Sequence, residues 1–145
     1  MTPRIAFEKK LLIIKEKLNL IDFNYSIIHI RLNDYETFNQ NTLDNILTNI
    51  NSIKLNNSDE NYVLIASNKI YLDHIKFPFI KQTGLNSGHV GLNTTSLNEC
   101  EDTMSEFMLM TTSNKIYQMS VYGWGSGFSD AINKIYDIDV IKYMI

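Results

Sequence analysis

The chain has 145 residues, of which 44% are hydrophobic, and a net charge of −3 from 13 basic and 16 acidic side chains. This is the length of one domain, and a domain of this size buries enough surface to fold without a metal ion or a disulfide. We therefore expect residues 1–145 to form a single domain. Basic residues do not outnumber acidic residues, which argues against direct binding of nucleic acid.

Cysteine content and hydropathy predict a cytoplasmic protein. Cys100 is the only cysteine, so an intramolecular disulfide is excluded and a reducing compartment is favoured. No apolar run approaches the roughly 20 residues of a membrane span, which excludes a membrane partner. The first ten residues carry charges where a signal peptide would have its apolar region.

The first half of the chain predicts two helices with one strand between them. Apolar residues recur every three or four positions from Phe7 to Ile21, which is the spacing of one helix face. Residues 23–32 are apolar on both alternating faces, which is typical of a strand inside a sheet. The second helix has its apolar face over residues 43–53. Its candidate N-caps are Asp34, Asn39 and Asn41.

The second half predicts two β-hairpins. The paired segments are residues 62–67 with 69–72, and residues 107–112 with 115–122. The pentapeptide Ser-Asn-Lys-Ile-Tyr occurs once in each hairpin, at residues 67–71 and 113–117. Asparagine tolerates the positive φ of a tight turn, so Ser-Asn-Lys is a plausible turn sequence.

The remaining segments complete an α+β prediction. Residues 83–105 are rich in glycine and small polar residues, so they predict loops. Ser129 is expected to cap a short helix, and residues 140–145 to form a final strand or extended tail. The predicted fold is therefore a single α+β domain with N-terminal helices, two β-hairpins in a mostly antiparallel sheet, and a short C-terminal helix.

The glycine-rich turn Gly123–Gly127 is the one segment with a possible phosphate-binding pattern, because it follows a predicted strand and precedes a helix. The match is incomplete, since Phe128 occupies the last glycine position of the dinucleotide fingerprint. Asp130, at the start of the helix, would also repel an anion. An exposed Trp124 between glycines is the simpler prediction, and tryptophan is a frequent anchor of protein contacts.

No catalytic residue, metal site or cofactor is predicted. The acidic neighbours of Cys100 disfavour the thiolate that a nucleophile needs. The three histidines and the cysteine lack zinc-ligand spacing. His29 lies in an apolar strand and is expected to be a core residue with its hydrogen bonds satisfied. His89, within Ser87–Gly91, is the only histidine in a loop-like context.

Acidic residues are the clearest charge feature. Residues 22–60 and residues 83–145 each carry a net charge of −4. An acidic surface attracts a basic partner and orients it during association. The predicted partner-binding residues are Glu99, Glu101, Asp102, Glu106, Trp124, Asp59 and Glu60.

In size, acidity and lack of catalytic motifs the chain resembles the immunity proteins of bacterial polymorphic toxin systems, including contact-dependent growth inhibition. The resemblance implies a non-catalytic antitoxin that binds a cognate protein toxin, with a basic nuclease domain, and masks its active site. It also implies a monomer or small homo-oligomer without cofactors. The alternatives are a small intracellular enzyme with a site around Ser87–Gly91 and Gly123–Gly127, or an accessory binding protein of a phage or mobile element.

Overall fold

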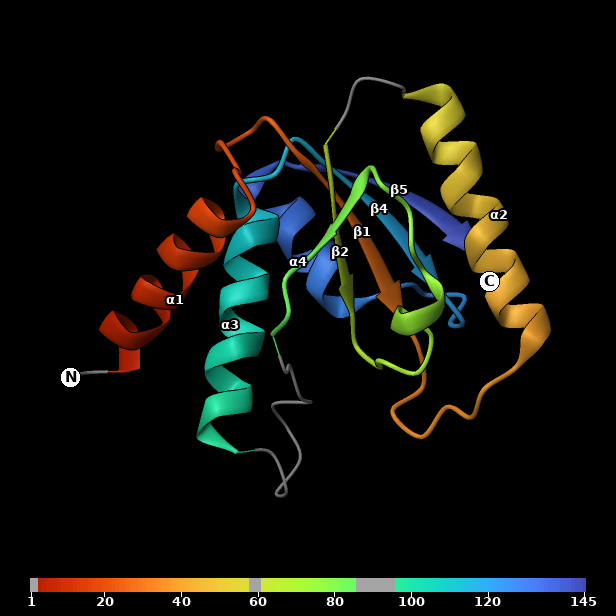
Figure 1. Cartoon of the computed structure of the whole chain (residues 1–145), viewed down its shortest axis with the longest axis horizontal. Coiled ribbons are helices and arrows are strands. Elements are labelled where there is room, and N and C mark those ends of the chain that lie inside the picture. The colour runs from red at the N-terminus through yellow and green to blue at the C-terminus, as the bar shows by residue number, and fades with distance from the viewer. Residues whose placement is uncertain (1–2, 58–60, 86–95) are drawn as a thin grey trace.

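Five strands form one sheet within the described part of the chain, and all neighbouring strands are parallel (Figure 1). The structure is a computed structural model that describes residues 3–57, 61–85 and 96–145. The strands are β1 (Ser26–Arg31), β2 (Tyr62–Ala66), β3 (Ile80–Gln82), β4 (Lys115–Ser120) and β5 (Asp139–Met144). Their order across the sheet is β3-β2-β1-β4-β5. The chain therefore winds outward from β1 to β3, then returns to the other side of β1.

Helical segments connect the strands, because parallel neighbours need a crossover connection. These are α2 (Gln40–Asn56), the short 3-10 helix η1 (Leu72–His74), α3 (Leu97–Thr111) and α4 (Gly127–Tyr136), while α1 (Pro3–Lys17) precedes β1. Right-handed crossovers in two winding directions place their helices on opposite faces of the sheet. Accordingly, α2 covers one face, and α1, α3 and α4 cover the other (Figure 1). No helix in the described ranges is both long and apolar enough to cross a membrane.

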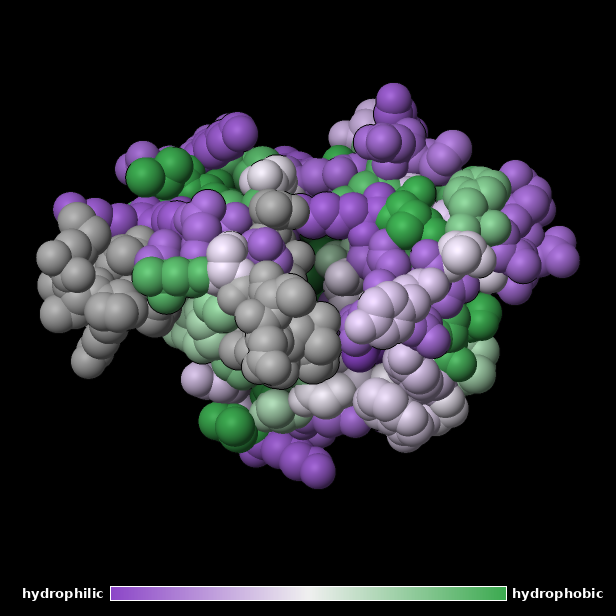
Figure 2. Space-filling model, turned by 90° about the horizontal axis from the view of Figure 1, so that it is seen from below, coloured by the Kyte–Doolittle hydropathy of each residue, from purple (hydrophilic) through white to green (hydrophobic). Residues whose placement is uncertain are grey.

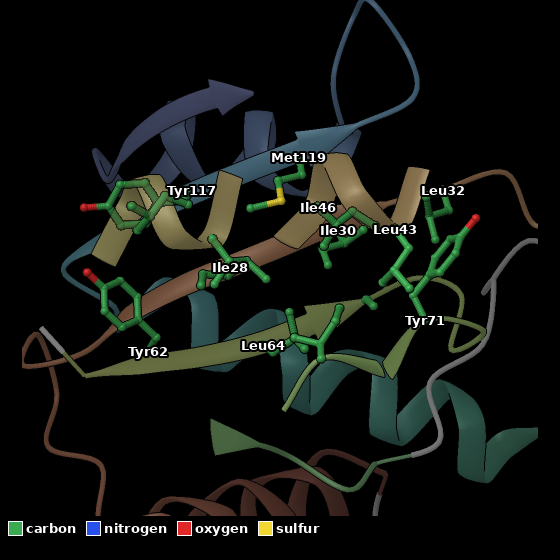
Figure 3. Close-up of a cluster of buried hydrophobic side chains, with 14 residues drawn as sticks. Ile28, Ile30, Leu32, Leu43, Ile46, Tyr62, Leu64, Tyr71, Tyr117 and Met119 are labelled. Atoms are coloured by element: carbon green, nitrogen blue, oxygen red, sulfur yellow. The ribbon is translucent and has the colours of Figure 1, made fainter. Parts of the chain in front are cut away.

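The face under α2 begins with Ser26 of β1 and Lys115 of β4 and is apolar from Ile28 and Tyr117 onward. Figure 3 shows the apolar cluster on this face. Its cluster contains Ile28, Ile30, Leu32, Leu64, Tyr117 and Met119 from the sheet side, and Leu43, Ile46, Ile50 and Ile53 from α2. Burying one such isoleucine stabilises the fold by about 1.5–3 kcal/mol. The side chain of Asn39 accepts a hydrogen bond from the Thr42 backbone N–H (3.1 Å) and so caps the start of α2.

The opposite face has its own apolar cluster. The cluster contains Ile27, Val63, Ile65 and Ile116 from the strands, and Ile14, Leu109, Met110 and Ile132 from α1, α3 and α4. β1 thus buries apolar side chains on both faces, which explains why the sequence of residues 23–32 reads as an internal strand.

Most elements of the first half and both C-terminal elements are confirmed. The helix predicted from Phe7 to Ile21 is α1, which ends earlier, at Lys17; the internal strand is β1, and Asn39 is the N-cap of α2. The short C-terminal helix exists, but it begins after Ser126; Ser129 lies inside it and is fully buried. The final strand is β5.

The prediction of an α+β fold with two hairpins in a mostly antiparallel sheet is wrong, because every strand pair is parallel. After β2 the chain does not reverse. Asn68 accepts a hydrogen bond from the Ile70 N–H (3.1 Å) and donates one to the Asn33 carbonyl (3.2 Å), which holds the turn beside the end of β1. Tyr71 then enters the core under α2 and leads into η1. The pentapeptide therefore follows β2 in one copy and begins β4 in the other.

Residues 107–112, expected to be a strand, form the end of α3 and the residue after it. The N-cap of α3 is Ser96, whose Oγ accepts a hydrogen bond from the Glu99 N–H (3.1 Å). Ser96-x-x-Glu99 is a capping box, a start signal that the loop assignment for residues 83–105 overlooked. Residues 86–95 of that segment lie outside the described residues.

Candidate functional site

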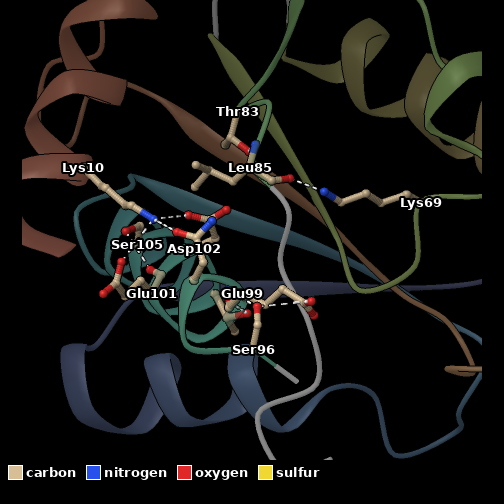
Figure 4. Close-up of polar contacts among 11 residues, drawn as sticks. Lys10, Lys69, Thr83, Leu85, Ser96, Glu99, Glu101, Asp102 and Ser105 are labelled. Atoms are coloured by element: carbon tan, nitrogen blue, oxygen red, sulfur yellow. Dashed lines mark hydrogen bonds and ion pairs between the residues drawn. The ribbon is translucent and has the colours of Figure 1, made fainter. Parts of the chain in front are cut away.

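The acidic cluster of α3 is largely engaged within the molecule (Figure 4). Lys10 of α1 lies 3.2 Å from Glu101 and 2.9 Å from Asp102, so these carboxylates join α3 to α1. The hydrogen bond with Asp102 is the largest of the effects that raise the pKa of Lys10. A carboxylate that is already paired with a lysine contributes little net charge to attract a basic partner.

The other predicted contact residues do not extend this cluster into one solvated face. Glu106 is 6% exposed and accepts a hydrogen bond of 2.8 Å from Thr83 Oγ1. Glu99 belongs to the capping box of α3. Asp59 and Glu60 lie outside the described residues, and Trp124 lies between β4 and α4. The structure therefore brings together Glu101 and Asp102 around Lys10 and places Trp124 on a different segment.

The strand order creates a second candidate site at the carboxyl ends of β1 and β4. These adjacent strands are followed by helices on opposite faces, α2 after β1 and α4 after β4. The two connections diverge and leave a crevice, which is where ligands of open α/β sheets bind. Figure 2 looks at the molecule from below, toward the carboxyl ends of the strands.

Polar side chains gather on one face of the sheet at this switch point. In the parallel register, His29 and Arg31 of β1 lie opposite Gln118 and Ser120 of β4. All four share the face of α3 and α4, because alternate residues of a strand point to the same side and Ile27 belongs to that cluster. His29, Gln118 and Ser120 are at most 3% exposed. Buried polar groups normally have hydrogen-bond partners, so each partner matters here.

Arg31 retains hydrogen-bonding capacity for a ligand. Its Nη1 donates to the Leu32 carbonyl (2.6 Å), Asp34 Oδ1 (3.2 Å) and Ser67 Oγ (3.2 Å). Its guanidinium carbon lies 5.5 Å from the centre of the Tyr122 ring. No hydrogen bond to another described residue uses Nε or Nη2. These remaining donors match the paired oxygens of a phosphate or a carboxylate.

Ser120 shapes the turn between β4 and α4. Its Oγ donates to the Gly125 carbonyl and accepts from the Tyr122 N–H, both at 3.0 Å. Gly125 has φ +88°, and a Cβ at this position would lie 2.3 Å from Gln118 Oε1. Glycine is therefore required both by the backbone conformation and by the close approach of Gln118.

The N-terminus of α4 lacks a side-chain cap among the described residues. Its N-cap Ser126 makes no side-chain capping bond, whereas the N-caps of α2 and α3 each accept a backbone N–H. Free N–H groups and the helix dipole favour an anion at this end.

Gln118 places a buried side-chain amide beside the turn into α4. It is 1% exposed, and its amide lies against the turn that leads into α4. Its Nε2 has no hydrogen-bond partner among the described residues. A buried donor without a partner costs about 1–3 kcal/mol, and a ligand oxygen at this position would remove that cost.

His29 fixes α4 to the sheet. Its Nδ1 and Ser129 Oγ share a hydrogen bond of 2.6 Å, and both residues are buried. Burial, together with the positive charge of Arg31, lowers the pKa of His29 to about 4. The imidazole is therefore neutral near pH 7, and it holds the first turn of α4 beside β1 without adding charge to the site. This agrees with the expectation of a core histidine.

Charge near the first turn of α4 is balanced by β5. Lys142 Nζ lies 3.3 Å from Asp130 Oδ1. The carboxylate of Asp130 is expected to repel an anion, but the neighbouring ammonium of Lys142 on β5 offsets its negative charge. Arg31 is likewise paired with Asp34 at 3.2 Å, so the helix end is the remaining positive feature of this turn.

An aromatic pair borders the site. The rings of Tyr122 and Trp124 are stacked, with centres 4.7 Å apart and planes 17° from parallel. Trp124 is 61% exposed, as the glycine-flanked position predicted. A planar group of a ligand or an apolar side chain of a partner protein can pack on this free surface.

Sequence reasoning named part of this site and missed the rest. It identified Gly123–Gly127 and Trp124, while Ser87–Gly91 falls in the part that the structure leaves undescribed. It missed Arg31, Gln118 and Ser120. The available signal was the presence of polar residues inside two otherwise apolar strands. Within the described ranges, no group of three or more histidine, cysteine or acidic residues is placed to hold a metal ion.

Fold and site together define the class: a doubly wound α/β domain with a polar switch-point site. Comparison of the chain with family models, with curated proteins and with solved structures found no match. The geometry of the site is therefore the basis for assigning a function.

Proposed function

We propose that this domain binds a phosphate-bearing ligand of the nucleotide type at the carboxyl ends of β1 and β4. The observation that carries the proposal is the buried, unpartnered Nε2 of Gln118 beside the open N-terminus of α4. Gln118 of β4 and the first turn of α4 both carry donors without a described partner, and an anionic group with several acceptor oxygens is a suitable partner for such donors.

The surrounding residues favour a nucleotide over inorganic phosphate alone. The free donors of Arg31 provide a second contact for a phosphate chain, across the switch point from α4. The exposed face of Trp124, supported by Tyr122, provides a surface on which a planar base can stack. This proposal develops the enzyme alternative built on Gly123–Gly127. It assigns the turn to binding and leaves the reaction open.

Calorimetric titration of the whole chain with ADP, GDP and UDP, and with pyrophosphate, tests the proposal. At least one nucleoside diphosphate is expected to bind, and Arg31→Ala to weaken that binding roughly 10-fold or more, since charged hydrogen bonds contribute about 1.5–3 kcal/mol. Lys134→Ala is the matched control, because it removes one exposed charge at the far end of α4. Equal affinities for Arg31→Ala and Lys134→Ala, or no binding of any probe, would contradict the proposal.

A second candidate function is neutralisation of a cognate protein toxin, as the resemblance to immunity proteins implies. The observation that favours it is the exposure of Trp124 next to Tyr122 and Arg31, since tryptophan, tyrosine and arginine are enriched in binding hot spots. Co-purification with a basic toxin domain encoded nearby is the test. Trp124→Ala should then weaken the complex by 2 kcal/mol or more on the usual ~2–4 kcal/mol scale of hot spots. An unchanged affinity would remove Trp124 from that interface.

A further inference from the structure

The edge strand β5 has an open side. It pairs with β4, and its six residues are all at least partly exposed. Ile141 is 39% exposed and Met144 is 67% exposed. An edge strand of this length offers backbone donors and acceptors to another strand.

The direction of the backbone groups identifies which part of the edge is open. The N–H of Ile145 donates to the Ser120 carbonyl of the β4 side (3.4 Å). Because backbone groups alternate in direction along a strand, those of Val140, Lys142 and Met144 point away from β4. The Met144 carbonyl already accepts a hydrogen bond from Asn49 Nδ2 of α2 (3.1 Å). Within the described part of the chain, the fully open pair is therefore Val140 and Lys142, with Ile141 between them.

We propose that two copies of this chain associate through β5, antiparallel and with a two-fold axis at Ile141. In an antiparallel pair, residues directly opposite each other exchange both of their backbone hydrogen bonds at alternate positions. An axis at Ile141 places Val140 opposite Lys142 of the second copy, and Lys142 opposite Val140. All open groups of this pair are then satisfied, and the two sheets become one continuous sheet of ten strands.

The side chains of β5 favour this register and favour a second copy of the chain as the pairing partner. An axis at Lys142 would set two lysines directly opposite each other, which is unfavourable. An axis at Ile141 sets two isoleucines together, so that both lose exposed apolar surface. A lysine on an edge strand normally discourages pairing, but Asp130 at 3.3 Å draws the Lys142 ammonium toward α4. The open edge is thus self-complementary, which favours a second copy.

Disulfide trapping tests the register. In a Cys100→Ser background, Ile141→Cys should form an intermolecular disulfide under mild oxidation, because a non-hydrogen-bonded antiparallel pair has Cα atoms about 4.5 Å apart. Lys142→Cys should cross-link much less, since the two residues then lie diagonally, about 7–8 Å apart. Preferential cross-linking of Lys142→Cys, or cross-linking of neither variant, would overturn the Ile141 axis.

Light scattering with proline variants tests the association itself. The unmodified chain should be dimeric at tens of micromolar. Lys142→Pro removes an outward N–H without disturbing the pairing with β4, so it should shift the protein to monomer. Lys142→Ala keeps that N–H and should remain dimeric. Circular dichroism should show the same fold in all three proteins. A monomeric wild type, or a dimeric Lys142→Pro, would overturn the proposal.

Discussion

The two faces of the sheet use the same strands for different purposes. Under α2, β1 and β4 begin with Ser26 and Lys115, and their side chains are then apolar up to the carboxyl end. Under α3 and α4, the same strands begin with Ile27 and Ile116 and then change to His29, Arg31, Gln118 and Ser120. The first face supplies stability that is independent of a ligand. The second face has fewer buried apolar side chains near the carboxyl ends of the strands, and the Gln118 amide there has no partner among the described residues.

Four predictions separate these roles, starting with the largest effect. Ile30→Ala removes a side chain that is 1% exposed in the cluster under α2. We expect it to lower the free energy of unfolding by roughly 2–5 kcal/mol, through lost transfer energy and the cavity left behind. Nucleotide affinity, measured on the folded fraction, should be nearly unchanged. Urea titration followed by calorimetry checks both. A large loss of affinity would show that the two faces are coupled.

The polar face should make stability depend on pH. His29 has a pKa of about 4 in the folded state against 6.5 when unfolded, so the unfolded chain binds more protons between these values. Stability from this residue is therefore complete above about pH 6.5 and is lost as pH falls toward 4, by about 3 kcal/mol in total.

His29→Asn tests that assignment, because it keeps a hydrogen-bonding group near Ser129 but cannot titrate. Urea unfolding at a series of pH values should show a shallower slope between pH 4 and 6.5 for this variant than for the wild type. Equal slopes would assign the acid sensitivity to other groups.

The turn into α4 should tolerate change at one glycine and not at another. Gly125→Ala meets both a positive φ and the Gln118 side chain, so a loss of roughly 2–3 kcal/mol and weaker ligand binding are expected. Gly123→Ala is the control, since an added Cβ there has no neighbour within 4 Å among the described residues. Its unfolding free energy should change by less than about 1 kcal/mol. Similar losses in both variants would contradict the assigned role of Gly125.

The smallest expected effect has the opposite sign. Gln118→Leu replaces the unpartnered amide with an apolar side chain, so the unliganded protein should become more stable by up to about 1 kcal/mol. The same change removes a ligand donor and should weaken nucleotide binding. Thermal unfolding with and without the nucleotide checks both parts. A destabilised protein would mean that the amide already has a partner.

Local signals accounted for part of the fold and for little of the site. The helical spacing of α1 and α2, the cap at Asn39 and the two-faced apolarity of β1 were all readable, because each depends on neighbouring residues. The hairpins were wrong because an apolar run followed by a turn has the same pattern whether the chain reverses or leaves for a crossover. The end of α3 was misread because its cap, Ser96, lies well before the apolar run.

The sequence by itself showed that the chain has enough apolar residues to form a core. Its periodicity also located several helices and strands, since periodicity depends on residues only a few positions apart. The sequence also marked Trp124 and the Gly123–Gly127 turn as unusual. Only the tertiary structure decided that all strands are parallel and that β4 lies beside β1. That adjacency brings Arg31 and Gln118, 87 positions apart, to one crevice. The physical reason is that strand order is set by long-range packing and crossover handedness, which leave no pattern within either strand.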